Sequence, residues 1–365
     1  MEGLTRRALM SGLAAVAGSG RMAAAAGVPA NAGLRDHAAR AGLIYGAAVT
    51  LESQGDPVTR ALYEREARIV TTDLELKFAG LRPTPDGFRF EGADTLVAWA
   101  RRQNLLVRGH TLIWNESNPD WLKRCSAREV ERIFEQHIET VVSRYAGRIH
   151  TWDVVNEPFW PDHGHPGGYR QGPWYNALGP DYIPRALKRV RAIDPNVKLC
   201  INEAHCELAT GWGAQIRPCL TRLATELRHA GVPLDAIGLQ AHLRPDKPYD
   251  DGRYAAFLHE LADTGVALHL TEFDVYDGGF PDDVAQRDAA VAARATAFLD
   301  AALAVPAVSM VVNWEIQDDH SFYDHEALAR DPAASRLPRP LPFDSLGARK
   351  PLWHAMAAAF DRRTA

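Results

Sequence analysis

The sequence predicts an α/β protein built as a single (β/α)8 TIM barrel, and three observations lead to this fold class. Eight short runs rich in Val, Ile and Leu recur after residue 40, and segments with helical spacing separate them. Strand and helix in alternation imply parallel strands joined by helical crossovers. Eight such units are the number that closes a barrel. An open doubly wound sheet is the alternative, but no Gly-x-Gly-x-x-Gly loop follows the first run.

The elements follow from these apolar runs, taken in chain order. The predicted strands are Ile44–Leu51, Ile69–Asp73, Leu105–His110, Ile149–Asn156, Val197–Asn202, Ala236–His242, Ala267–Val275 and Val308–Trp314. The clearest helix is predicted over Ser126–Tyr145, where apolar residues repeat every three or four positions and charged residues fall largely on the other faces. No low-complexity linker or short repeat divides residues 33–365, which are therefore predicted to form one domain.

Composition excludes several classes of protein. The chain has 365 residues, 46% hydrophobic and 24% charged, which is typical of a globular protein rather than a disordered one. The 41 basic and 46 acidic residues give a net charge of −5 without a basic stripe, so no nucleic-acid partner is expected. No apolar stretch reaches ~18 residues without a polar break, so no membrane span is expected. The four cysteines lack zinc-ligand spacing, and no metal site is predicted.

The first 32 residues are predicted to be an export signal. Arg6 and Arg7 precede a weakly apolar run from Leu9 to Ala17, and small residues end the segment at Ala30-Asn31-Ala32. This order of basic, apolar and small-residue regions is typical of a secretory signal. The arginine pair and low hydrophobicity favour the twin-arginine route, which gives a periplasmic or secreted protein. A poorly structured alanine-rich terminus is the alternative.

Chemistry in a (β/α)8 barrel belongs at the carboxyl ends of its strands. Carboxylates, amides, imidazoles and indoles gather at those ends: Asp73, Glu75, Lys77, His110, Trp114, Asn156, Glu157, Asn202, Glu203, Gln240, His242, Glu272, Asp274 and Trp314. A soluble barrel places some polar residues there in any case. So many of these types together predict a site for a polyhydroxylated ligand.

Two of these residues form a candidate catalytic pair. Glu157 ends the fourth predicted strand and Glu272 ends the seventh, and these strands face each other across an eight-stranded barrel. Hydrolysis of a glycosidic bond needs one carboxyl with a raised pKa to protonate the leaving oxygen. It also needs an ionised carboxylate to attack or to direct water. A single glutamate at a strand end is more often solvated or ion-paired, but Asn156, His242 and Trp314 accompany this pair.

Four segments resemble glycoside hydrolase family 10, the retaining endo-β-1,4-xylanases. They are Arg-Gly-His-Thr-Leu-Ile-Trp (108–114), Trp-Asp-Val-Val-Asn-Glu-Pro (152–158), Gly-Leu-Gln-Ala-His (238–242) and Thr-Glu-Phe-Asp-Val (271–275). The resemblance covers most of residues 41–360. It implies a catalytic barrel over 33–365 with a polysaccharide substrate and no cofactor. A monomer is expected.

The resemblance also implies a role for each matched residue. Glu157 corresponds to the general acid/base and Glu272 to the nucleophile. His242 and Asp274 correspond to the network that keeps the nucleophile ionised and oriented. Asn156 corresponds to the residue that binds the 2-hydroxyl of the reacting sugar. The residues that match the cradle for the two sugars on the non-reducing side are Lys77, His110, Trp114, Gln240 and Trp314.

The sequence departs from the family pattern beyond the reacting sugar. Leu74 stands where an amide usually binds the distal sugar, and Phe78 replaces a tryptophan. Asn115 replaces histidine, Glu203-Ala204-His205 replaces Asp-Tyr-Asn, Glu315 replaces glycine and Phe322 replaces tryptophan. Hydrolysis of a branched or acidic bacterial exopolysaccharide is therefore an alternative to xylan hydrolysis. A glycan-binding barrel without activity is a further alternative, although both glutamates are present.

A Gly/Pro-rich segment from Pro161 to Gly172 leaves two questions open. His163 and His165 could bind a metal, although a solvated loop over the cleft is the favoured interpretation. The aromatic residues that flank the segment, Trp160, Trp174 and Tyr175, could stack on leaving-group sugars or pack on the barrel. Elsewhere, Cys206 and Cys219 could form a disulfide after export, although sequence alone does not fix the pairing.

Overall fold

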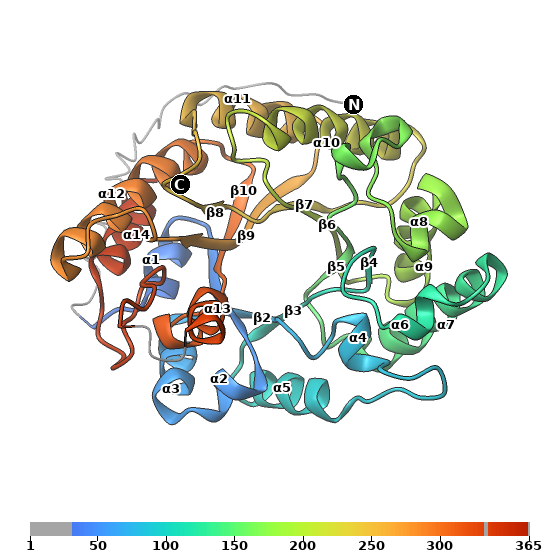
Figure 1. Ribbon diagram of the computed structural model, residues 1–365, viewed down its shortest axis with the longest axis horizontal. Coiled ribbons are helices and arrows are strands. Elements are labelled where there is room, and N and C mark those ends of the chain that lie inside the picture. The colour runs from blue at the N-terminus through green and yellow to red at the C-terminus, as the bar shows by residue number, and fades with distance from the viewer. Residues whose placement is uncertain (1–30, 332–334, 364–365) are drawn as a thin grey trace, which may run out of the picture. The chain divides into compact units, whose positions relative to one another are not determined.

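Eight parallel strands form a closed ring in the computed structural model, which describes residues 31–331 and 335–363. The ring follows the order β10-β1-β2-β3-β5-β6-β7-β9, and pairing between β9 and β10 closes it (Figure 1). The bounds are β1 Ile44–Val49, β2 Ile69–Thr72, β3 Leu106–Gly109, β5 Thr151–Asn156, β6 Lys198–Glu203, β7 Ala236–Leu239, β9 Ala267–Val275 and β10 Val308–Asn313. The predicted (β/α)8 barrel is confirmed, with all eight strands where the apolar runs placed them.

Helices cover the outside of this ring (Figure 1). The helices between successive strands, and after the last, are α3 Pro57–Glu66, α5 Glu91–Arg102, α7 Ala127–Tyr145, α9 Tyr182–Ile193, α10 Trp212–His229, α11 Asp251–Ala262, α12 Val284–Leu303 and α14 Pro351–Arg362. Shorter helical segments are α1 Leu34–Arg40, α2 Leu51–Gly55, α4 Phe78–Leu81, α6 Asp120–Lys123, α8 Pro173–Leu178, α13 Phe322–Arg330, η1 Pro161–His163, η2 Pro166–Gly168, η3 Gly179–Asp181 and η4 Asp318–His320.

The predicted helix over Ser126–Tyr145 forms as α7 with Ser126 as its N-cap. The backbone N–H of Glu129 donates to the Ser126 hydroxyl, and the Ser126 N–H donates to the Glu129 carboxylate at 2.7 Å. This reciprocal pair satisfies two N–H groups at the helix start, a contribution of about 1 kcal/mol. The apolar face, which includes Val130, Ile138 and Val141, is buried as the spacing predicted.

A buried polar cluster fills part of the barrel interior below the strand ends. Arg108 in β3 and Asp153 in β5 form an ion pair with side chains 0% and 1% exposed. The same carboxylate lies 3.0 Å from Nδ1 of His110, and the Arg108 guanidinium lies 3.0 Å from Nδ1 of His269. Removing one partner from such a pair would leave an unpaired buried charge, which costs about 3–5 kcal/mol. The cluster therefore fixes His110 from beneath.

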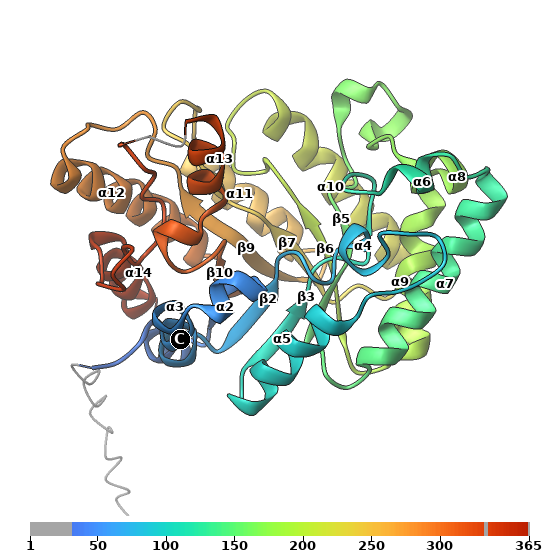
Figure 2. The ribbon, with the colours of Figure 1, turned by 60° about the horizontal axis from the view of Figure 1, so that its bottom comes forward.

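The carboxyl ends of the strands carry most of the short segments. Two-residue strands β4 (Ile113–Trp114) and β8 (His242–Leu243) extend the sheet beside the ends of β5 and β9. Figure 2 shows α6, α8 and α13 toward the same end of the barrel. The connections at this end therefore surround the strand-end side chains predicted to form the site.

Several sequence predictions concern features other than the barrel. The predicted export signal lies outside the described residues except for Asn31 and Ala32. The four cysteines are free thiols, so the structure does not form the disulfide considered for Cys206 and Cys219. Of the helices in the described ranges, none combines the length and apolar character that crossing a bilayer requires. Those ranges also contain no group of three or more His, Cys, Asp or Glu placed to hold a metal ion.

Candidate active site

Glu157 is held by three donors at the end of β5. Its Oε1 accepts a hydrogen bond of 2.8 Å from Nε2 of Gln240, and its Oε2 accepts one of 3.2 Å from Nε1 of Trp114. Nη2 of Arg170 lies 2.8 Å from the same Oε2. The Glu157 backbone adopts a positive φ of 47°, and its N–H donates to the carbonyl of Asn202. The carboxyl is therefore fixed from several elements around the barrel mouth.

The surroundings of Glu157 suit a proton donor. Burial raises the pKa of its carboxyl. The positive charge of Arg170 and the hydrogen bond from Gln240 oppose this rise, whereas the negative charges of Glu272 and Glu116 add to it. The net pKa lies above the ordinary value for glutamate. Glu157 therefore keeps its proton to a higher pH than a solvated glutamate does.

Glu272 in β9 is 5% exposed and is also held at both oxygens. Nδ2 of Asn202 donates to its Oε1 at 2.7 Å, and Nε2 of His242 lies 3.2 Å from its Oε2. The other ring nitrogen of His242 lies 2.8 Å from the Asp274 carboxylate. The imidazole thus bridges two carboxylates, an arrangement that fits a protonated ring donating to both.

These contacts keep Glu272 ionised. Burial alone would raise its pKa, but hydrogen bonds from His242 and Asn202 and the charges of His110 and His242 outweigh burial. The pKa of Glu272 therefore lies below its ordinary value. For His242, burial lowers the pKa, but Asp274 and Glu272 reverse that effect and raise the pKa well above the usual value. The two catalytic candidates thus have pKa values displaced in opposite directions.

Asn202 connects the nucleophile candidate to Asn156. The same Nδ2 that contacts Glu272 lies 2.9 Å from Oδ1 of Asn156. Oδ1 of Asn202 accepts a hydrogen bond of 2.6 Å from the Thr271 hydroxyl. Because the Asn156 oxygen is already engaged, its amide nitrogen is the group left to donate to a ligand. This is the donor that a sugar hydroxyl beside Glu272 would need.

Two tryptophans and a lysine lie close together at the same barrel mouth. Nζ of Lys77 lies 5.6 Å from the ring centre of Trp114 and 5.7 Å from that of Trp314, and it pairs with Asp73 at 2.8 Å. The His110 ring lies 5.4 Å from the Trp314 ring. Apolar ring faces beside a cation and an imidazole suit the mixed surface of a pyranose. All ten predicted site residues thus belong to one connected group.

Comparison with known proteins agrees with this geometry. The sequence model of glycosyl hydrolase family 10 matches residues 33–359. The chain belongs to this family. It is 32% identical to endo-1,4-beta-xylanase C of Phanerodontia chrysosporium over 296 residues, which is 80% of this chain and 69% of that protein. It is also 32% identical to endo-1,4-beta-xylanase A of Caldicellulosiruptor sp. (strain Rt8B.4) over 250 residues, 63% of this chain and only 34% of the longer relative.

A solved structure extends the family comparison to the fold. Xylanase 10B from Thermotoga petrophila RKU-1, crystallised in complex with xylobiose, superposes with a TM-score of 0.81. Its sequence is 26% identical, and the match covers 92% of this chain and 99% of that one. The family 10 barrel is therefore present from end to end in the described part of this protein.

Several departures from the family 10 pattern are structural. Phe78 is 4% exposed and packs against the rings of Trp121, His137 and Trp174, so it forms no wall for a sugar. The Oδ1 of Asn115 accepts from the N–H groups of Trp174 and Tyr175, each at 3.1 Å, and so caps the start of α8. The replacement of tryptophan by Phe78 is therefore a change within the core.

Two other departures differ in exposure. Leu74 is 53% exposed on the connection after β2, where its side chain can reach a ligand. Glu315 lies at a φ of 71°, a conformation that explains why glycine is usual there. Its buried carboxyl accepts from the Tyr63 hydroxyl at 2.5 Å, and burial raises its pKa well above the ordinary value. Glu315 thus faces the core, whereas the Leu74 side chain is exposed on the connection after β2.

Sequence reasoning missed Arg170 as a member of the site. It follows Glu157 by 13 residues in the Gly/Pro-rich segment, away from the strand ends and from the two histidines of that segment that the sequence pointed to. In the structure, Nδ1 of His163 accepts from the Gln171 N–H at 2.9 Å. Trp160 follows Glu157 by three residues, and Arg170 forms a cation–π pair with its ring. This contact, which links Arg170 to the site, depends on tertiary structure and could not be read from the sequence.

The aromatic residues of this segment take different positions. Trp174 is fully buried and its Nε1 donates to the Trp114 carbonyl at 2.9 Å, so it packs rather than stacks on ligand. Trp160 is half-buried, and its ring centre lies 4.4 Å from that of Trp212. A hollow of about 770 Å³, lined by Trp212, His205, His242 and Phe322 among others, extends the site from the nucleophile side.

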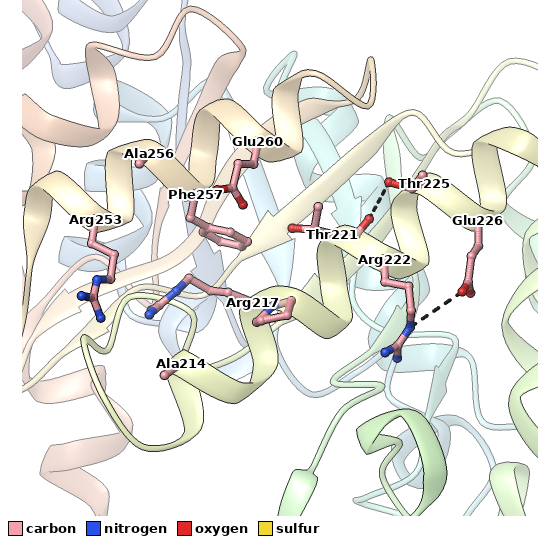
Figure 3. Close-up of a pocket in the computed structure, with 11 residues that line it drawn as sticks. Ala214, Arg217, Thr221, Arg222, Thr225, Glu226, Arg253, Ala256, Phe257 and Glu260 are labelled. Carbon is pink, nitrogen blue, oxygen red and sulfur yellow. Dashed lines mark hydrogen bonds and ion pairs between the residues drawn. The ribbon is translucent and has the colours of Figure 1, made fainter.

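A second hollow of about 560 Å³ lies between α10 and α11 (Figure 3). Its lining includes Arg222 and Glu226, which pair with each other along α10 and are largely exposed. Its other glutamate, Glu260, is also exposed. None of the lining residues belongs to the carboxylate pair or to its hydrogen-bond partners. This groove is therefore separate from the candidate active site.

Proposed function

We propose that this protein is a retaining endo-β-1,4-xylanase that acts by double displacement. The observation that carries the proposal is the pair Glu157 and Glu272, two buried carboxyls whose pKa values are displaced upward and downward at one barrel mouth. Such a divergence assigns the acid and the ionised partner. The printed names of the family 10 relatives, endo-1,4-beta-xylanases, support xylan as the substrate.

The chemistry follows from these positions. Glu157 gives its proton to the glycosidic oxygen while a carboxylate oxygen of Glu272 bonds to the anomeric carbon, and the chain on the reducing side leaves with the protonated oxygen. Glu157, now a carboxylate, then takes a proton from water, whose oxygen displaces Glu272 from the same carbon. Two inversions leave the β configuration. Asn156 donates to the 2-hydroxyl, a contact that strengthens as positive charge develops on the ring.

The remaining site residues bind the sugars on the non-reducing side. Lys77 donates to hydroxyls, His110 and Gln240 offer ring and amide hydrogen bonds, and the Trp114 and Trp314 faces contact the pyranose C–H surfaces. A second candidate substrate is a decorated or acidic polysaccharide, which the exposed Leu74 favours. A barrel that only binds glycan is disfavoured because both carboxyls retain partners that prepare them for catalysis.

Reducing-end release on a panel of xylan, β-glucan and bacterial exopolysaccharides tests the substrate. We expect release from xylan, with mixed oligosaccharides as early products. Proton NMR of the first product tests the mechanism, and the β anomer should appear first. Retention requires carboxyls ~5–5.5 Å apart, too close to admit a water between carboxylate and sugar. Early α anomer, or exclusive activity on another polymer, would contradict the proposal.

Leu74 is predicted to weaken binding of unbranched xylan at the distal non-reducing subsite. A sugar hydroxyl facing this side chain has no amide partner, so Leu74→Asn should raise kcat/KM on xylotetraose. Because the position is 53% exposed, we expect the gain near about 1 kcal/mol, roughly fivefold. Acetylated xylan, whose masked hydroxyl suits an apolar contact, should gain less.

Leu346 provides the matched control. It is also an exposed leucine, but it lies on the segment before α14 and belongs to none of the residues assigned to the site. Leu346→Asn should leave kcat/KM unchanged on both xylotetraose and acetylated xylan. If Leu74→Asn leaves the ratio of the two rates at the parental value, Leu74 does not set specificity and the departure is neutral.

We also propose that the enzyme is exported by the twin-arginine route, as the Arg6-Arg7 pair and the small-residue region up to Ala32 suggest. Replacing both arginines with lysine should leave the enzyme in the cytoplasmic fraction of the expressing cell. Unchanged recovery from the periplasm or medium would assign export to another route or signal.

A further inference from the structure

Arg170 contacts the acid/base candidate at two points. Its Nη2 donates to Oε2 of Glu157 at 2.8 Å, and its Nε donates to the Glu157 backbone carbonyl at 3.0 Å. The second bond supports a residue whose backbone lies in the left-handed region, at a φ of 47°. One guanidinium therefore holds both the side chain and the main chain of Glu157.

The guanidinium is itself fixed on its remaining sides. Nη1 pairs with the Glu116 carboxylate, and the plane lies 4.3 Å from the centre of the Trp160 ring. The Arg170 backbone N–H donates to the Pro158 carbonyl at 2.8 Å. Its side chain is only 5% exposed although it comes from a surface connection. A buried, stacked and forked arginine of this kind is not a solvated charge.

Three further carboxyl groups lie around Glu157. Glu116 approaches from the β4–α6 connection, Glu272 from β9 and Glu203 from β6. The remaining contacts, from Trp114 and Gln240, are neutral donors. Arg170 therefore supplies the opposing positive charge in direct contact with a carboxyl that must change its charge twice in each catalytic cycle.

We propose that Arg170 is a positioning residue that strengthens Glu157 as an acid by stabilising the carboxylate it becomes on giving up its proton. The proposal rests on the function proposed above. As the glycosidic oxygen takes the proton, negative charge develops on Oε2, which is the oxygen that Arg170 contacts. In the second step the same pairing makes Glu157 a weaker base toward water, so Arg170 favours bond cleavage over breakdown of the intermediate.

The proposal gives Arg170 a signature that a packing role lacks. An opposite charge within hydrogen-bonding distance lowers a carboxyl pKa by about 1–3 units. Arg170→Met should therefore move the alkaline limb of kcat/KM upward by about one unit or more. It should also slow xylobiosides with poor leaving groups, about tenfold or more, because only these need a strong acid. Aryl xylobiosides with the best leaving groups should change little.

The experiment compares Arg170→Met and Arg170→Lys with Arg222→Met. Lysine keeps the charge and should hold the alkaline limb near its parental position. Arg222 provides the matched control, because its Nη2 donates to the Gly167 carbonyl of the same segment at 2.8 Å, while its Nε pairs with Glu226 rather than with Glu157. Its replacement should leave the pH profile and the leaving-group dependence unchanged.

Glu116→Gln is a second test that does not depend on how well the Arg170 variants fold. Glu116 is 60% exposed and competes for the same guanidinium. Removing its negative charge should shift the alkaline limb downward, the opposite direction to Arg170→Met. An unmoved limb in folded Arg170→Met, equal slowing of all leaving groups, or an upward shift in Glu116→Gln overturns the inference. An alkaline limb that persists in Glu157→Gln would instead remove Glu157 as the acid, and with it the proposed function.

Discussion

Glu272→Ala is expected to abolish turnover of xylan, with a loss of roughly 10⁴-fold or more in kcat, as is usual when a nucleophile is removed. The reason is that the substitution removes the carboxylate oxygen that forms the covalent intermediate. Asn202 and His242 fix both oxygens of this carboxylate in a site where it is 5% exposed. Initial rates on xylohexaose, with circular dichroism to confirm folding, measure the loss.

Azide distinguishes loss of the nucleophile from loss of structure. The alanine leaves space beside the anomeric carbon, and azide entering there attacks from the face that Glu272 occupied. An activated β-xyloside should then give the α-xylosyl azide by a single inversion. Glu131→Ala, which removes a half-exposed carboxylate on α7, is the control and should keep the parental rate and show no azide effect. Parental turnover by Glu272→Ala would remove this residue from the mechanism.

The two candidate catalytic glutamates could be located from sequence because their positions depend on strand order alone. In a parallel barrel every strand ends at the same rim, so Asn156-Glu157 and Glu272 must meet once the apolar runs are recognised as strands. Asn202 shows what strand order predicts and what it does not. It ends a predicted strand, yet its bridging of Glu272 and Asn156 depends on side-chain geometry that spacing does not encode.

The connections were less predictable, because burial there depends on packing between segments distant in sequence. Trp160 and Trp174 flank one segment, and the sequence does not distinguish them. Only Trp174 is enclosed, by the rings of Phe78 and Phe134. Leu74 and Phe78 are four residues apart, and one is exposed while the other joins the core. Arg170 contacts Glu157 only because the segment between them folds back across the mouth.

Backbone conformation was a further property that the sequence did not reveal. Glu157, Ala241 and Glu315 all adopt positive φ at or just after strand ends, although none is glycine. Such positions are strained for L residues and persist only where surrounding contacts enforce them. At Glu157 those contacts include the Asn202 carbonyl and the Arg170 guanidinium. The strain thus accompanies the placement of the acid.

Glu157→Ala is expected to lower kcat/KM on xylan by about 10²–10⁴-fold and to remove the alkaline limb of its pH profile. In the parent, kcat/KM should rise with pH as Glu272 ionises below its ordinary pKa. It should fall as Glu157 loses its proton above the ordinary pKa, because burial holds that pKa up. Without the acid only the rising limb should remain. Rates measured from acid to alkaline pH on xylotetraose check both limbs.

Substrate choice separates loss of the acid from loss of binding. An aryl xylobioside with a good leaving group departs without a proton, so Glu157→Ala should form its glycosyl-enzyme at close to the parental rate and then accumulate it, because no base activates water. A burst followed by slow turnover is the expected time course. Azide should accelerate the slow phase and give the β-xylobiosyl azide, opposite in anomeric configuration to the product of Glu272→Ala, since it now attacks the face from which the leaving group departed. Equal slowing of good and poor leaving groups, or the same azide anomer from both variants, would mean that the two glutamates do not divide the roles of acid and nucleophile between them.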